Sequence, residues 1–190
     1  MTTPYVTSLT RIALAEYSAY AGHHETDAVL SARIRQYWQE IGQTFPGVET
    51  PWSGAFISWC VRSAGTTAAE FKVSARHSAY VHWAIANADA GTGLFQGVAF
   101  DAAPPALGDL IQWNRGGGKF DFAHARNSKT YISHVAVVVA SGQDSHGAYV
   151  LTIGGNESDS VGRTRVPLNA DGRILQRARS PFICLIRTLK

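Results

Sequence analysis

Hydrophobic residues recur at three- and four-residue spacing through the first half of the chain, which is the pattern of amphipathic helices. Gly22, Gly42 and Gly65 come after three of these runs, and glycine suits the residue that ends a helix. The pattern predicts four helices, over residues 7–21, about 26–41, 53–65 and 78–88.

The pattern changes from Gly91 onward, where glycine, proline and β-branched residues become frequent and apolar positions alternate. A polar, glycine-rich segment at 114–129 is predicted as a long loop, and such loops are usually functional or mobile. Helices followed by an antiparallel sheet make an α+β fold, and 190 residues suit one domain. We therefore expect one domain over residues 1–190, with a helical part at about 5–90 and a sheet part at about 91–190. Five strands are predicted, over residues 109–113, 131–140, 148–153, 162–166 and 182–188.

The start of the third predicted helix is the first candidate for a functional site. Pro51 stiffens the approach, and Ser53 stands at the N-cap or in the first turn. A nucleophile there lies at the positive end of the helix dipole, beside free backbone N–H groups, and acyl transfer requires both features. Serine before an apolar helix is more often simply a cap, so Ser53 alone does not decide between the two roles.

Two polar residues farther along change that balance. His134 opens a predicted strand, and Asn156 follows two glycines at the end of the next strand. A nucleophile on a helix start, a histidine on one strand and a polar residue on its neighbour make a papain-like arrangement. Strand alternation places His134 on the same face as Ala136, so the side of the sheet on which they lie decides its role. A histidine satisfied by the backbone and an asparagine that forms a turn are the structural alternatives.

Residues 51–60 resemble the helix motif of the CHAP and NlpC-type cell-wall hydrolases. In that superfamily a Trp-Cys-small-Ala-Phe motif leads into an apolar helix, and Gly-Asp-aliphatic, His-Val-aliphatic and Gly-Asn segments follow. This chain has, in the same order, Gly108-Asp109-Leu110, His134-Val135-Ala136-Val137 and Gly155-Asn156. The resemblance covers roughly residues 50–160. It departs at Ser53, which stands where those enzymes carry the catalytic cysteine, as in a less characterised bacterial branch of the superfamily.

The resemblance implies a papain-like fold and a catalytic group of Ser53, His134 and Asn156. Ser53 is then the nucleophile, His134 the base, and Asn156 the side chain that orients the imidazole. The resemblance also implies a structural role for Asp109. A serine gains less than a cysteine from the helix dipole because its pKa lies far above neutrality, so Ser53 depends on a well-placed base. Cys60 lies about two turns into the helix and is predicted as a core residue.

Three further side chains are candidates for substrate binding. Trp52 and Trp113 are predicted to form an aromatic wall for a sugar or a peptide. His77, three residues before Tyr80, begins a helix that borders the predicted cleft. Core packing and helix capping are the alternatives for all of them.

Composition narrows the classes of function. The net charge of +3 is mild, and the basic C-terminal quarter favours an anionic surface such as a bacterial wall without forming the basic face of a nucleic-acid module. No run of eighteen apolar residues exists, so no membrane span is expected. Cys60 and Cys184 lie in apolar runs and are predicted as buried free thiols, although two cysteines also permit one disulfide. Histidine and cysteine spacing matches no metal site, and we expect neither a metal nor another cofactor.

The N-terminal residues lack the basic start and apolar core of a secretory signal. We therefore expect synthesis in the cytoplasm, with delivery to the wall by a secretion machine, by phage lysis, or by a signal that lies outside the given sequence.

The leading hypothesis is a peptidoglycan hydrolase, an amidase or endopeptidase that cleaves an amide bond of the wall stem peptide. The alternative is a catalytically inactive relative that binds wall fragments or a protein partner. A third hypothesis keeps the same chemistry in an antibacterial effector whose cleft is blocked by an immunity protein.

Overall fold

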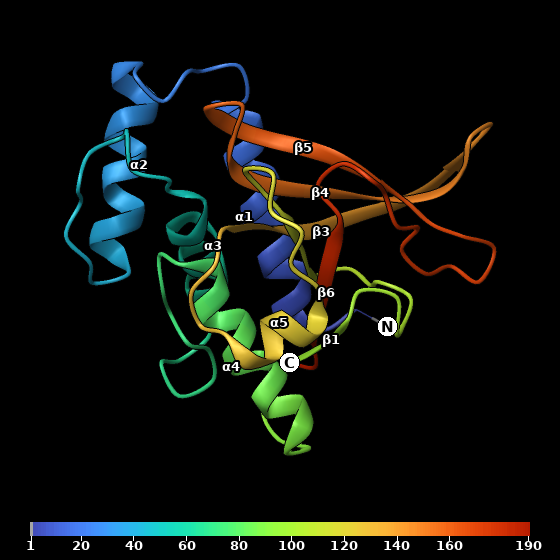
Figure 1. Ribbon diagram of the computed structural model, residues 1–190. Coiled ribbons are helices and arrows are strands. Elements are labelled where there is room, and N and C mark those ends of the chain that lie inside the picture. The colour runs from blue at the N-terminus through green and yellow to red at the C-terminus, as the bar shows by residue number, and fades with distance from the viewer. Residues whose placement is uncertain (1) are drawn as a thin grey trace.

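The structure is a computed structural model that describes residues 2–190. Helices come first and an antiparallel sheet second, so the α+β prediction is confirmed (Figure 1). The four predicted helices are present, and α5 is an additional short helix inside the glycine-rich segment, capped by the carboxylate of Asp121. Six residues are too few to show helical periodicity, which is why the sequence pattern did not predict it. The helices are α1 (Pro4–Tyr20), α2 (Ala28–Glu40), α3 (Ser53–Ser63), α4 (His77–Asp89) and α5 (Phe122–Asn127).

The sheet has six strands in the order β1-β6-β2-β3-β4-β5, and all neighbours are antiparallel. The predicted strands correspond to β2 to β6, and the edge strand β1 was not predicted. Gly97 lies inside β1 because α4 passes so close that an added Cβ would lie 2.7 Å from Ile85. The strands are β1 (Phe95–Ala99), β2 (Leu110–Asn114), β3 (Ser133–Asp144), β4 (Gly147–Glu157), β5 (Ser160–Pro167) and β6 (Phe182–Thr188).

The helices cover one face of the sheet, and the β3–β4 hairpin extends away from them (Figure 1). Val135 and Val137 belong to the core cluster shared with the helices, whereas Ala136 and Val138 belong to a second cluster with Trp113. Alternate residues of β3 therefore face different clusters.

Helix α3 lies at the centre of the core, with every residue from Ser53 to Val61 buried. Tyr37 of α2 contacts the rings of Trp52 and Phe56, and an added Cβ on Gly155 of β4 would lie 2.5 Å from Trp52. Tight packing on both sides therefore fixes the first turn of α3 between α2 and the sheet.

Two predictions about individual features can be read directly from the fold. Cys60 and Cys184 are buried free thiols, as predicted. No helix within residues 2–190 is long and apolar enough to cross a membrane.

Candidate active site

Ser53 is the first residue of α3, and its hydroxyl points to a histidine. Its Oγ lies 2.7 Å from Nε2 of His77, at hydrogen-bond distance. The preceding residue, Trp52, occupies the N-cap position and makes no side-chain capping bond. Ser53 is thus not the N-cap, and it lies in the first turn where backbone N–H groups have no partner within the helix.

The close approach of two chain segments explains why His77 reaches Ser53. Gly54 follows Ser53, and an added Cβ there would lie 2.1 Å from the carbonyl oxygen of Ala75. Only glycine allows residues 75–76 to pass this close, and α4 begins immediately afterwards with His77. Gly54 therefore allows α4 to begin close to α3, and this brings the imidazole of His77 to Ser53.

His77 is buried and is held on its other nitrogen by the hydroxyl of Tyr80, one turn along α4. Burial lowers the pKa of His77 well below its usual value, with smaller contributions from His134 and Arg115. The imidazole is therefore neutral at pH 7. Burial also raises the pKa of Tyr80, so its hydroxyl keeps its proton.

His134 lies beside His77, with their ring centroids 5.4 Å apart. The register of β2 and β3 pairs it with Trp113, whose ring lies 4.7 Å away. It therefore faces the second cluster and reaches His77 at the end of the sheet. Its Nε2 lies 3.0 Å from Oε1 of Glu157, and its Nδ1 is buried with no hydrogen-bond partner within residues 2–190. Burial lowers the pKa of His134, and the hydrogen bond to Glu157 partly offsets that effect.

Asn156 does not make the contact with His134 that the sequence predicted, and Glu157 makes it instead. Asn156 has a φ of 56° at a point where the pairing of β4 with β5 shifts register between Gly154 and Glu157. Such an irregularity re-aims side chains, because the regular alternation of a strand is lost there. The catalytic group predicted from sequence is therefore corrected at its third member: the carboxylate next along the chain holds the imidazole of His134.

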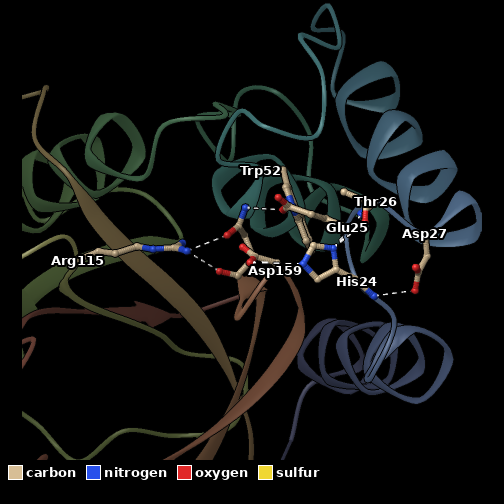
Figure 2. Close-up of polar contacts among 8 residues, drawn as sticks. His24, Glu25, Thr26, Asp27, Trp52, Arg115 and Asp159 are labelled. Carbon is tan, nitrogen blue, oxygen red and sulfur yellow. Dashed lines mark hydrogen bonds and ion pairs between the residues drawn. The ribbon is translucent and has the colours of Figure 1, made fainter.

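Asn156 instead anchors Arg115. Nη2 of Arg115 donates to the backbone oxygen and to Oδ1 of Asn156, at 2.8 Å in both cases. Glu25 accepts from Nδ2 of Asn156 at 3.3 Å and from Nε1 of Trp52 at 2.8 Å (Figure 2). These contacts join the loop before α2, the N-cap of α3 and the residue after β2 around one asparagine.

The three candidate substrate-binding residues have different positions. Trp52 is fully buried, and its indole is occupied by Glu25, so it offers no surface to a substrate. Trp113 is also buried, between His134 and Phe182. His77 alone of the three lines the cavity in front of Ser53. Both tryptophans pack in the hydrophobic core instead of forming the expected aromatic wall.

An open cavity of about 900 Å³ lies in front of Ser53 and His77. That volume falls in the range of small-molecule and peptide sites. Its other lining residues come from α2 and the loop before α3, the segment before α4 and its first turn, the start of the glycine-rich loop and residues 129–133. A substrate in the cavity can therefore reach the hydroxyl of Ser53 at the helix N-terminus.

Asp109 is buried away from this group and has a structural role, as the resemblance implied. It accepts hydrogen bonds from the backbone N–H groups of Ala106 and Thr188. Within residues 2–190, no group of three or more His, Cys, Asp or Glu side chains has the geometry to hold a metal ion.

A family profile described as "uncharacterized protein conserved in bacteria" (DUF2272) matches residues 17–184. The chain belongs to this family. The match includes Ser53, His77, His134 and Glu157, so the whole candidate site lies inside the DUF2272 region. No curated protein and no solved structure matches the chain.

Two members of the site were not predicted in their observed roles. His77 was expected to touch substrate, and its partner Tyr80 follows at a spacing of three, which is the signal of a contact along one helix face. Glu157 follows Asn156 directly, and no periodic rule gives its direction once the strand becomes irregular. The one signal in the sequence was glycine at 154, which can mark a close approach of another group in a strand. In the structure that group is His134, since an added Cβ at Gly154 would lie 2.7 Å from its Nε2.

Proposed function

We propose that the protein hydrolyses an amide bond in the stem peptide of bacterial peptidoglycan, with Ser53 as the nucleophile. One observation carries this proposal: a serine hydroxyl at a helix N-terminus, on the wall of an open cavity, is held by His77 beside a second imidazole, His134, whose Nδ1 has no partner within residues 2–190. Nucleophilic catalysis by serine needs both a nearby base and donors for the developing oxyanion.

The relationship to CHAP and NlpC-type hydrolases belongs to the same proposal. A helix carrying the nucleophile packs against an antiparallel sheet, and the histidine at the start of β3 follows in the order of that superfamily. The contact between His134 and Glu157 on the neighbouring strand supports the comparison. We take the fold to be papain-like on this basis.

The hydrogen bonds give the two imidazoles different roles. Within residues 2–190 the protonated hydroxyl of Tyr80 has His77 as its one hydrogen-bond partner, so it is satisfied by donating to Nδ1 of that ring. Nε2 of His77 then carries hydrogen and donates to Ser53 Oγ. His134 donates from Nε2 to Glu157, which leaves the lone pair on its unpartnered Nδ1. His134 is thus the base, Glu157 orients it, and His77 with Tyr80 positions the nucleophile.

In the chemical step the hydroxyl of Ser53 turns its proton toward Nδ1 of His134 as Oγ attacks the amide carbon. Catalytic hydrogen bonds are often long before substrate binds, so the absence of a direct Ser53–His134 bond in the free protein agrees with this step. The proton passes to the leaving amine, and water then releases the acyl group from Ser53 by the same route. Backbone N–H groups in the first turn of α3 stabilise the oxyanion.

Purified sacculi provide the test. The wild-type protein is expected to release soluble muropeptides with new amino termini, and Ser53→Ala is expected to abolish release while keeping the native fold by circular dichroism. Equal release by both proteins would remove Ser53 from the mechanism.

Ser53→Cys addresses the inactive alternative, which the serine in place of cysteine favours. If the wild type is silent and Ser53→Cys releases muropeptides, the protein is a binding relative with preserved geometry. If both are active, the serine enzyme is established. An immunity protein added to this assay is expected to inhibit the release of muropeptides.

A further inference from the structure

The cavity in front of Ser53 carries a strong bias of charge. Three cationic side chains line it, Arg76, Arg115 and Lys129, and no aspartate or glutamate does. None of the three forms a salt bridge within residues 2–190, whereas Arg33, Arg126, Arg165, Arg187 and Lys190 all do. The lining of this cavity therefore carries three cations without a salt-bridge partner in the described chain and no carboxylate.

Arg115 is fixed rather than free to move. Its Nη2 is held by two oxygens of Asn156, a neutral residue, so its charge is not compensated there. Its Nη1 is buried and has no hydrogen-bond partner in the described chain. The guanidinium of Arg115 therefore lines the cavity with a charge that no anion of the described chain neutralises, and an anionic ligand in the cavity would supply that partner.

The charge of Arg115 also acts on the catalytic group. It contributes to the lowered pKa of both His77 and His134, so it lies close enough to influence both rings. Arg76 precedes His77 directly, and Lys129 approaches from the loop that follows α5. The three cations therefore come from three separate segments of the chain that line one cavity.

We propose that the cavity recognises an acidic peptide, whose free carboxylates bind Arg115, Arg76 and Lys129 beside the amide that Ser53 attacks. This inference rests on the proposed function for the position of the scissile bond, but the recognition itself requires no catalysis. Arg115 forms a short-range contact with a carboxylate, while Arg76 and Lys129 are exposed and act through longer-range attraction.

The experiment measures binding to the Ser53→Ala protein, so that cleavage does not interfere. Two probes of equal size are titrated by calorimetry: N-acetyl-alanyl-glutamate and its neutral counterpart, N-acetyl-alanyl-glutamine amide. The acidic peptide is expected to bind at least about tenfold more tightly, and its affinity is expected to fall as salt is raised because screening weakens exposed charges. Equal affinities for the two peptides would overturn the proposal.

Variants locate the binding site. Arg115→Gln and Lys129→Gln, each in the Ser53→Ala background, are expected to weaken binding of the acidic peptide and to leave the neutral one unchanged. Lys72→Gln removes an exposed lysine that does not line the cavity and is the matched control. If Lys72→Gln weakens binding as much as Arg115→Gln, the effect is one of net charge and the site is wrong.

Inorganic phosphate separates a peptide site from a general anion site. Phosphate at the same concentration is expected to bind more weakly than the acidic peptide, and equal or tighter binding would contradict the assignment to carboxylates. Selective binding without any hydrolysis of sacculi by the wild type would support this inference and remove only the proposed hydrolase. Hydrolysis with no preference for acidic substrates would support the proposed hydrolase and overturn the recognition of acidic peptides.

Discussion

Nε2 of His134 lies 3.0 Å from Oε1 of Glu157, although the sequence pattern favoured the preceding residue, Asn156, as its partner. The carboxylate fixes which nitrogen of the ring carries hydrogen, and it leaves Nδ1 as the basic atom. The second imidazole, His77, contacts Ser53 directly. The site therefore contains two histidines with separable roles.

Substitution of the two histidines distinguishes those roles. His134→Ala is expected to lower kcat/KM about 1,000-fold, within the range typical of a lost general base. His77→Ala is expected to lower it about 10- to 100-fold, which is the scale of a lost positioning hydrogen bond. Steady-state kinetics on a soluble wall peptide provide the measurement.

The conservative variant His77→Gln makes this comparison sharper. A glutamine amide retains an N–H donor near the place of Nε2, so it is expected to recover part of the activity lost in His77→Ala. A base cannot be replaced in this way, and failure of glutamine together with a loss equal to that of His134→Ala would make His77 the base. The exposed His146→Ala serves as the control for loss of an imidazole outside the site.

The pH dependence follows from the lowered pKa of His134. Burial lowers this pKa, and the base acts only when neutral, so activity is expected to rise with pH below the ordinary histidine value of about 6.5 and to level off at neutrality. Glu157→Gln removes the group that raises the pKa, so the acid limb is expected to move to lower pH while the maximum rate falls. A limb that moves to higher pH in Glu157→Gln would contradict the proposed pairing.

The four long helices and five of the strands were predictable because their apolar residues recur at helical spacing or gather in β-branched, alternating runs. Ser53 was predictable for a related reason, since proline, a small polar residue and an apolar run mark a helix start. The direction of Asn156 was not predictable, because the irregular pairing of β4 with β5 breaks the alternation that assigns strand residues to faces. Sequence alternation cannot predict side-chain direction where the pairing of two strands changes register.

The contact between Ser53 and His77 was beyond local rules for another reason. It depends on the packing of residues 75–76 against Gly54, a tertiary approach that no periodicity encodes. His77 was placed near the cleft only because it begins a helix. The tryptophans show the converse error: aromatic side chains near a site were assigned to substrate, whereas Trp52 is occupied by Glu25 in the core.

Stability depends on a buried carboxylate that joins α1 and α2. Glu16 is 7 % exposed and accepts hydrogen bonds from Nε of Arg33 at 3.0 Å, from its Nη2 at 2.6 Å, and from the hydroxyl of Tyr37. Glu16→Ala leaves a largely buried guanidinium without its partner and is expected to cost about 3 kcal/mol in the free energy of unfolding. Urea denaturation measures the loss, and the exposed Glu49→Ala is the control. A cost below about 1 kcal/mol would place this pair among ordinary surface ion pairs.

The two cysteines are expected to take no part in catalysis, which separates a serine mechanism from a hidden thiol one. Burial raises the pKa of both Cys60 and Cys184, so at pH 8 neither forms the thiolate that attacks a carbonyl or a thiol reagent. Ellman's reagent is expected to react with both thiols in denaturant and with neither in the native protein. Cys60→Ala is expected to keep activity within about twofold, because Cys60 lies in the hydrophobic core about two turns from Ser53, the proposed nucleophile. Inactivation of the native wild type by a thiol reagent, prevented by Cys60→Ala, would transfer the role of nucleophile from Ser53 to Cys60.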